Sequence, residues 1–413
     1  MIHIAKPSLG EEECAAVVEA IKSGWVTQGP RVAAFEEAFC RQTGAKYACA
    51  VSSCTTALHL ALLSVGVQPG DVVITVSHSF IATANAIRVC NAEPVFVDIE
   101  PQNGNMAPQE LASCIAKDFS PRSGGDLFYR HVPRLQRAAT SPLNYIREPL
   151  GRLGAILVVH QAGMPADLQN ILLLAHRYNI PLVEDAACAI GSQIFLDDRW
   201  QHIGLPHGDI ACFSFHPRKL VTTGDGGMLT VKDTAHDVRL RLLRQHGMTV
   251  SDTARHTSNK VIFEQYSEAA YNYRLTDIQA AMGLEQLNRL PKLIQRRREL
   301  AEQYIQELRN VSAIATPEEP TSNRSNWQTF LITLKEPANQ LPLMEFLLAQ
   351  GIATRRGIMC AHREVPYKDA WHDEQLPHSC RAQDGRIALP LHDALDEKVI
   401  SAICRHIQDF FAC

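Results

Sequence analysis

Apolar runs rich in β-branched residues alternate with helical patterns through the first 250 residues of the chain. We expect strands at Lys46–Val51, Val72–Val76, Glu93–Val97, Ala155–Val159, Pro181–Glu184, Asp209–Phe215 and Met228–Val231. We expect helices between several of them, at Thr56–Val65, Thr83–Val89 and Leu168–Tyr178. This alternation predicts a mostly parallel seven-stranded sheet sandwiched by helices. Ligands of such sheets bind at the carboxyl ends of the strands.

The pattern changes in the second half of the chain. A long helix is expected over Thr276–Arg309, where Thr276 and Gln279 fit a capping box and Pro291 is expected to break or kink it. Shorter mixed segments then predict a smaller α+β domain, at Trp327–Leu334, Leu341–Gln350, Ile352–Arg355 and Leu395–Phe411.

We therefore expect a large α/β domain over residues 1–250, and a linking helix with a small C-terminal α+β domain over residues 251–413. One stretch of the large domain, residues 119–152, is rich in arginine and proline and has few acids. It predicts a long irregular insertion, either a solvated surface segment or one with a binding role.

Composition narrows the class of protein. The chain has 413 residues, of which 46% are hydrophobic and 20% charged, which is typical of a globular protein and excludes disorder and arrays of membrane helices. Its formal net charge of −4 gives no reason to expect nucleic-acid or membrane binding. The start lacks the apolar core of a signal peptide, and the 12 cysteines form no CxxC, so we expect a cytoplasmic protein with reduced cysteines and no metal site.

Lys219 follows the expected strand Asp209–Phe215 and precedes a glycine-rich turn. A lysine at the mouth of a parallel sheet is partly desolvated, which disfavours its ammonium form and frees an amine for Schiff-base chemistry. The alternative is an ordinary surface lysine in a turn.

Asp185 ends another apolar strand, where a carboxylate needs a cation or hydrogen-bond donors. A protonated pyridine nitrogen is such a cation, and this pairing keeps pyridoxal phosphate (PLP) an electron sink. The alternative role is an N-cap for the following turn.

A phosphate site is indicated where a strand leads through small polar residues into a helix. The backbone around Cys54 and the hydroxyls of Ser53, Thr55 and Thr56 lie at the expected helix start, and Ser214 adds a hydroxyl beside Lys219. Plain helix capping is the alternative.

Phe80 follows the strand Val72–Val76 and either stacks on a planar cofactor or lies in the core. A phosphate site, a stacking ring, a carboxylate and a lysine, each at a strand end, together indicate a fold-type-I PLP enzyme.

On these residues the chain resembles the DegT-type sugar aminotransferases, fold-type-I PLP enzymes that aminate keto sugars, usually nucleotide-linked. The resemblance is carried by SGWVTQGP (23–30), AVSSCTTALHLAL (50–62), VEDAACAIGS (183–192), FSFHPRKLVTTGDGGM (213–228), YNYRLTDIQAAMGLEQL (271–287) and LPLH (389–392).

The resemblance implies an aminotransferase with glutamate as the amino donor and a keto sugar as the acceptor. Its pathway would be the biosynthesis of amino sugars for cell-surface glycans such as lipopolysaccharide or for natural products. Lys219 would hold PLP as a Schiff base and move the proton, and Asp185 would pair with the pyridine nitrogen. The other implied contacts are Thr55, Thr56 and Ser214 to the phosphate, Phe80 to the ring, and Asn272 to the phosphate of a neighbouring subunit. The last contact implies a homodimer with shared active sites.

Three features depart from the family pattern. Cys54 stands where glycine is common, and Cys188 stands where glutamine or histidine usually lies near the cofactor's ring hydroxyl. The span from Asp98 to His160 is longer than usual because of the insertion.

Candidates for substrate contacts are Trp25 and Thr27 in the first loop, His246, and the adjacent Arg355 and Arg356. The arginines are suited to a substrate carboxylate or phosphate. Core packing for Trp25, a helix-end role for His246 and a solvated strand edge for an arginine stay open.

Three other functions stay open. A sugar dehydratase of the same fold would replace the Schiff-base lysine with histidine, which Lys219 argues against. A non-enzymatic PLP-binding regulator would carry a DNA-binding module. A different phosphate-binding α/β protein is disfavoured because the chain has neither GxGxxG nor GxxxxGK[ST]. A free acidic keto sugar stays possible as the acceptor.

Overall fold

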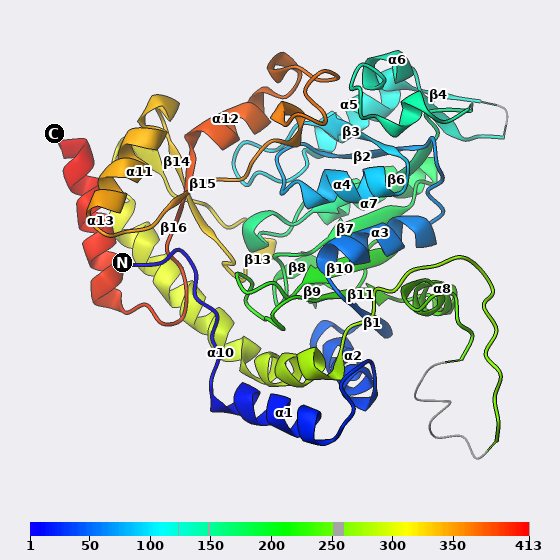
Figure 1. Cartoon of the computed structure of the whole chain (residues 1–413). Coiled ribbons are helices and arrows are strands. Elements are labelled where there is room, and N and C mark those ends of the chain that lie inside the picture. Colours follow the sequence, from blue (N-terminus) through cyan, green and yellow to red (C-terminus); the bar gives the residue numbers. More distant parts are fainter. Residues whose placement is uncertain (123, 148, 251–259, 413) are drawn as a thin grey trace.

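The computed structural model describes residues 1–122, 124–147, 149–250 and 260–412 (Figure 1). Its largest sheet has seven strands in the order β1-β11-β10-β7-β6-β2-β3. These strands are β1 (Tyr47–Val51), β2 (Val72–Val76), β3 (Glu93–Val97), β6 (Leu153–Val159), β7 (Leu182–Asp185), β10 (Ile210–Ser214) and β11 (Gly227–Val231). Only β11 runs antiparallel to its neighbours, so the predicted mostly parallel sheet is confirmed.

Neighbouring residues of a strand point to opposite faces of the sheet, and consecutive residues of these strands are buried and apolar. Both faces of the sheet are therefore apolar. In β1, Ala50 belongs to one buried hydrophobic cluster and Val51 to another. The helices of this part cover the two faces (Figure 1): α2 (Pro30–Thr43), α3 (Cys54–Ser64), α4 (Ala82–Val89), α5 (Pro108–Asp118), α7 (Leu168–Tyr178) and α8 (Thr234–Arg244).

A long helix, α10 (Asp277–Leu308), packs against α1 (Glu11–Lys22) and runs on to the second part of the molecule (Figure 1). It begins with the predicted capping box, in which Thr276 Oγ1 accepts from the Gln279 N–H (3.2 Å). The helix continues through Pro291, so of the two predicted effects, a break or a kink, the break does not occur. Buried leucines on both sides of Pro291, Leu290 and Leu293, hold the helix against its neighbours and offset the missing backbone hydrogen bond.

The second part is a small α+β unit with its own core. Its antiparallel sheet has the order β12 (Ile314–Ala315), β14 (Phe330–Leu334), β16 (Arg386–Leu389) and β15 (Arg355–Arg356). Helices α11 (Gln340–Ala349), α12 (Pro377–Gly385) and α13 (Glu397–Ala412) accompany it. The first residues of the chain also lie here, because the Ile2 N–H donates to Gly351 O (2.7 Å).

The arginine-rich insertion is more ordered than its sequence predicts. It contains the hairpin β4 (Phe119–Pro121) and β5 (Leu127–Tyr129), the short helix α6 (Val132–Leu135) and the 3-10 turn η1 (Pro142–Asn144). The Arg134 guanidinium lies 4.1 Å from the centre of the Trp371 ring, so the insertion packs against the C-terminal half of the chain.

The remaining elements connect these parts. A three-stranded sheet is made of β13 (Asn323–Arg324), β8 (Gln193–Leu196) and β9 (Arg199–His202). The 3-10 turns are η2 (Gln161–Gly163), η3 (Pro337–Asn339), η4 (Ala361–Arg363) and η5 (Asp373–Gln375). Among the described residues, no helix has the length and apolar character needed to cross a membrane.

Candidate active site

A cavity of about 770 Å³ opens where the carboxyl ends of the central strands meet the small α+β unit. Its wall includes most of the predicted site residues: Cys54, Thr55, Phe80, Asp185, Cys188, Ser214, Lys219, Arg355 and Arg356. The residues from Cys54 to Lys219 lie together at the carboxyl edge of the parallel sheet, as expected for such a sheet, and the small α+β unit adds Arg355 and Arg356 to the same wall.

Asp185 is the last residue of β7 and is only 5% exposed. Its Oδ2 accepts a hydrogen bond from Thr83 Oγ1 (2.8 Å), and its Oδ1 accepts one from the Ala187 N–H (3.2 Å). Burial raises the pKa of Asp185, and these hydrogen bonds only partly counter it. The carboxylate is thus fixed in place and poorly compensated, which suits it to a cationic ligand.

Lys219 lies in the loop after β10, the strand that pairs with β7 and places Cys212 opposite Asp185. Its Nζ donates to Cys188 Sγ (3.0 Å). Burial by itself lowers the pKa of Lys219, but Cys188, Cys54 and Asp185 favour the ammonium form and raise the pKa overall. This corrects the prediction that desolvation disfavours the ammonium form of Lys219, because its interactions with Cys188, Cys54 and Asp185 together outweigh the effect of burial.

The first turn of α3 gives two adjacent threonines different environments. Ser53 is the N-cap, and its Oγ accepts from the Thr56 N–H (3.2 Å) while Thr56 Oγ1 accepts from the Ser53 N–H (3.1 Å). Thr56 is thus engaged in the cap, whereas Thr55 is exposed in the cavity wall. Cys54 starts the helix without a positive φ, so it fits this turn without the strain that would require glycine.

Gly227 of β11 lets this turn approach the sheet. A Cβ at Gly227 would lie 2.5 Å from the carbonyl carbon and oxygen of Ser53 and 2.7 Å from the nitrogen of Cys54. Any larger residue would therefore displace the start of α3.

Phe80 and Ser214 complete this side of the cavity. Phe80 is 65% exposed, so its ring is available to a ligand rather than packed in the core. Ser214 Oγ accepts a hydrogen bond from the His216 N–H (3.4 Å) at the end of β10.

The other predicted residues lie outside the cavity wall of this chain. Asn272 is exposed and its backbone pairs with Gln245. His246 is exposed and adopts a φ of 63°. Trp25 donates its indole N–H to Gln28 O (3.1 Å), and Thr27 is exposed beside it.

Sequence reasoning missed a buried pair behind Asp185. His160 Nδ1 accepts from the Ala166 N–H (3.0 Å), so its Nε2 carries the proton and donates it to Glu184 Oε2 (3.1 Å). Burial would raise the pKa of Glu184, but the hydrogen bond from His160 and the His207 ring, whose Nδ1 lies 3.8 Å away, hold it well below its usual range. His160 also lines the cavity, and its position directly after β6 is a sequence signal for it.

A second cluster was invisible in the sequence because its members are far apart. His362 Nε2 lies 3.1 Å from Asp373 Oδ1 and 3.5 Å from Cys380 Sγ. Asp373 also accepts from Arg363 at 2.7 Å and 3.0 Å, so its carboxylate is compensated within the protein. The described cysteines are all free, and most are buried.

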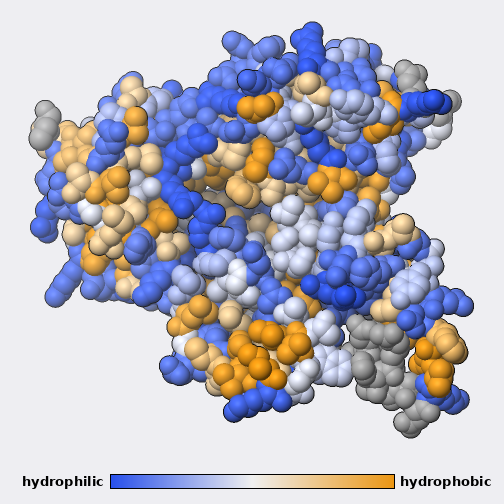
Figure 2. Space-filling view, in the orientation of Figure 1, coloured by the Kyte–Doolittle hydropathy of each residue, from blue (hydrophilic) through white to orange (hydrophobic). Residues whose placement is uncertain are grey.

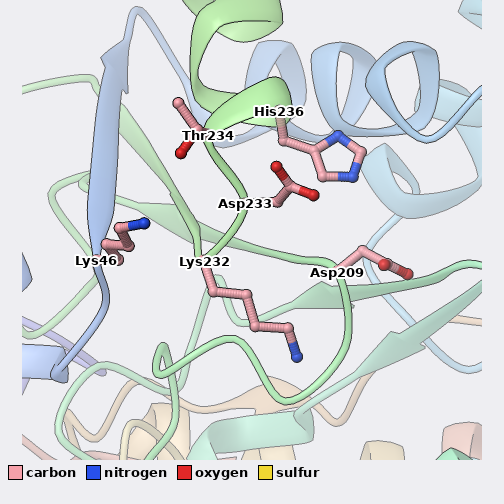
Figure 3. Close-up of a pocket in the computed structure, with 6 residues that line it drawn as sticks. All are labelled: Lys46, Asp209, Lys232, Asp233, Thr234 and His236. Atoms are coloured by element: carbon pink, nitrogen blue, oxygen red, sulfur yellow. The ribbon is translucent and has the colours of Figure 1, made fainter.

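A smaller hollow of about 370 Å³ lies away from these residues, at the start of α8 (Figure 3). Two lysines, Lys46 and Lys232, and two aspartates, Asp209 and Asp233, balance its charge. Asp233 is engaged as the N-cap of α8, where its Oδ1 accepts from the Ala235 N–H (2.7 Å). None of the predicted site residues lines this hollow, so the chemistry belongs to the larger cavity.

Comparison with known proteins agrees with this geometry. The model of the DegT/DnrJ/EryC1/StrS aminotransferase family matches residues 7–408. Among solved structures, the aminotransferase TlmJ from Streptoalloteichus hindustanus is 31% identical, with 100% of this chain and 99% of TlmJ covered and a TM-score of 0.82. DesV from S. venezuelae is 26% identical, with 98% and 95% covered and a TM-score of 0.82.

A third structure, the PLP form of Spr1654 from Streptococcus pneumoniae, shares the fold at 24% identity, with 100% and 98% covered and a TM-score of 0.82. The match over nearly the whole chain, together with the lysine and aspartate in one cavity, establishes the fold-type-I architecture and the family. The chain belongs to the DegT/DnrJ/EryC1/StrS aminotransferase family, whose enzymes in general depend on PLP, and it is an aminotransferase.

Proposed function

We propose that this enzyme uses PLP to transfer an amino group from glutamate to a keto sugar that is carried on a nucleotide. The observation that carries the proposal is that Lys219 and Asp185 face one cavity from adjacent strands of the central sheet. The overall exchange balances, because glutamate and the keto sugar become 2-oxoglutarate and the amino sugar.

The groups lining the cavity fit PLP. The start of α3, with Thr55 exposed at its first turn, offers N–H and hydroxyl donors to a phosphate, and Ser214 adds another hydroxyl. Phe80 presents an exposed ring for stacking, and the poorly compensated carboxylate of Asp185 suits a protonated pyridine nitrogen. The relative Spr1654 was solved in a PLP form, which supports the same cofactor here.

When bound, PLP supplies the electron sink that stabilises negative charge at the reacting carbon. Asp185 would keep the ring nitrogen protonated. Lys219 Nζ would remove the proton from the α-carbon of glutamate and deliver protons in the second half of the exchange. The Cys188 thiol, 3.0 Å from Nζ, would keep the amine at the floor of the cavity while it is not engaged.

We propose a homodimer with shared sites. Asn272 is exposed and lies outside the cavity of its own chain, as a residue serving a neighbouring subunit would. Figure 2 shows hydrophobic atoms gathered over α1 and the adjoining part of α10, where Val18 and Ile21 of α1 are 45% and 54% exposed. Exposed apolar patches of this kind are typical of subunit interfaces.

The test is to incubate purified protein with PLP, glutamate and a panel of keto sugars, and to measure 2-oxoglutarate and the aminated product. Free and nucleotide-linked sugars, including acidic ones, identify the acceptor. Formation of 2-oxoglutarate with a stable amino sugar supports the proposal. A deoxygenated product without net amino transfer would instead establish a dehydratase, and no reaction with any pair would contradict the proposed function.

A further inference from the structure

Three arginines stand at the entrance of the active-site cavity, and we call them the rim: Arg218, Arg355 and Arg356. Arg218 precedes Lys219 in the loop after β10, whereas Arg355 and Arg356 form β15 of the small α+β unit. Four cationic side chains, the rim and Lys219, line the cavity against two carboxylates, those of Asp185 and Asp225. A cavity with this excess of positive charge attracts anions.

Two of the rim arginines have no carboxylate partner within the described part of the chain. Arg356 lies 4.0 Å from Glu364, while neither Arg218 nor Arg355 has an ion pair there. The loop of Arg218 is held by its backbone, because its carbonyl accepts from Gln328 Nε2 (2.6 Å). Its guanidinium has no hydrogen bond or ion pair to any residue that the structure describes.

The two unpaired arginines line the same cavity. Burial, and then the charge of Arg355, lower the pKa of Arg218, and burial and the charge of Arg218 lower the pKa of His216. Like charges gathered at one entrance repel, so an oxyanion that neutralises both would be bound in preference to water.

We propose that Arg218 and Arg355 form an oxyanion subsite that binds a carboxylate or phosphate group of the substrate across the two parts of the molecule. A guanidinium binds either group through two parallel hydrogen bonds. This subsite is separate from the one for the cofactor's phosphate, which would lie at the start of α3. The inference rests on the proposed function for the source of the anion, which is either the diphosphate of a nucleotide-linked sugar or a carboxylate of glutamate.

The test is calorimetric titration of the PLP-loaded enzyme with two probes that do not react. Pyrophosphate represents the diphosphate of the acceptor, and glutarate represents the carboxylates of the donor. The variants are Arg218→Ala, Arg355→Ala and Arg355→Lys, with Arg381→Ala as the matched control, because Arg381 is an exposed arginine of α12 outside the cavity wall.

We expect each alanine variant to raise the Kd of at least one probe about tenfold relative to the wild type, and Arg355→Lys to recover part of the loss because it keeps the charge without the planar fork. Arg381→Ala should bind like the wild type, and an unchanged PLP absorption band would show that each variant is folded. A loss confined to pyrophosphate identifies the acceptor as the source, and a loss confined to glutarate identifies the donor.

The inference is overturned if the wild type binds neither probe, or if the alanine variants bind both as tightly as the wild type does. Because binding is measured without turnover, this result is independent of the proposed function. An enzyme that aminates a keto sugar but shows no such losses would contradict only the subsite, and one that shows the losses but transfers no amino group would contradict only the function.

Discussion

The floor and the rim of the active-site cavity are built in opposite ways. The floor comprises Asp185, Lys219 and the first turn of α3, all placed by strand pairing, capping and buried hydrogen bonds. The rim arginines are exposed, and two of them form a strand only two residues long. A floor fixed by the backbone suits chemistry that every substrate needs. An exposed rim can change its side chains without disturbing the fold, so we expect it to select among substrates.

Replacing the floor lysine should have the largest effect. Lys219→Ala should reduce turnover at least roughly 10³-fold, because no other described amine reaches the same position in the cavity. Release of 2-oxoglutarate and the visible absorption of bound PLP are the measurements. Lys232→Ala, at an exposed lysine of the other hollow, is the control and should keep full activity. A Lys219→Ala enzyme with more than a tenth of wild-type turnover would contradict the proposed mechanism.

Asp185→Asn should lower turnover and at the same time raise the thermal stability of the PLP-free protein. Turnover should fall about 10²-fold, since the ring nitrogen loses its anion. Burial raises the pKa of Asp185, so the stability that its neutral form provides is present at low pH and is lost as the pH rises through that pKa. An always neutral Asn should therefore raise the Tm of the PLP-free protein at pH 7 by roughly 2 °C.

Thermal melts of the wild type and the asparagine variant across pH check this sign. The advantage of the variant should shrink as the pH falls through the raised pKa of Asp185, where the wild-type carboxyl also becomes protonated. An advantage that grows on acidification would show that the carboxylate stabilises this fold.

Gly227→Ala probes how tightly the floor is packed. Its Cβ would meet the Ser53 carbonyl at 2.5 Å, so we expect a loss of about 1–3 kcal/mol in the free energy of unfolding and weaker PLP binding. Denaturant titration and PLP titration measure the two effects. Gly385→Ala is the matched control, because the nearest atom to its Cβ would be Leu334 O at 3.4 Å. An equal free energy of unfolding for both variants would mean that the start of α3 shifts away from the new methyl group without loss of stability.

The smallest effects are expected for the two adjacent threonines of α3, where one substitution should lower stability and the other should weaken PLP binding. Thr56→Val removes a capping hydroxyl and should cost about 1 kcal/mol of stability. Thr55→Val should leave stability nearly unchanged and raise the Kd for PLP roughly tenfold, because it removes one hydrogen bond to a charged group. Melting in the absence of PLP and fluorescence titration with PLP distinguish the two, and the reverse pattern would refute the assignment of Thr55 to the ligand.

The floor was largely predictable from the sequence, whereas its surroundings were not. The seven strands could be predicted because both faces of the sheet are buried, so that each strand is a continuous apolar run. Lys219 and Asp185 could be singled out because each lies at or just after a strand end. Thr55 and Thr56 could not be told apart in the sequence. Successive side chains of a helix point about 100° apart, and only the position of the N-cap fixes that Thr55, and not Thr56, lines the cavity.

Other features depend on contacts that no spacing reveals. In the sequence, Arg218 belongs to the lysine motif and has no link to Arg355. Only the packing of the small α+β unit brings both arginines to the same cavity. The hairpin in the insertion has strands of three residues, too short for an alternating pattern to be recognised. The helix through Pro291 survives because of leucines packed around it, which local propensity does not include.

The pairing of β7 with β10 has a consequence for how this enzyme would fail under heat or denaturant. Neighbouring strands are held about 4.8 Å apart by their backbone ladder, so the spacing of the lysine and aspartate loops cannot drift while the ladder is intact. Loss of the first half of the exchange should therefore coincide with melting of the whole sheet. The proposed oxyanion subsite includes Arg355 of a two-residue edge strand, so we expect anion binding at the rim to be lost at milder conditions than the chemistry of the floor.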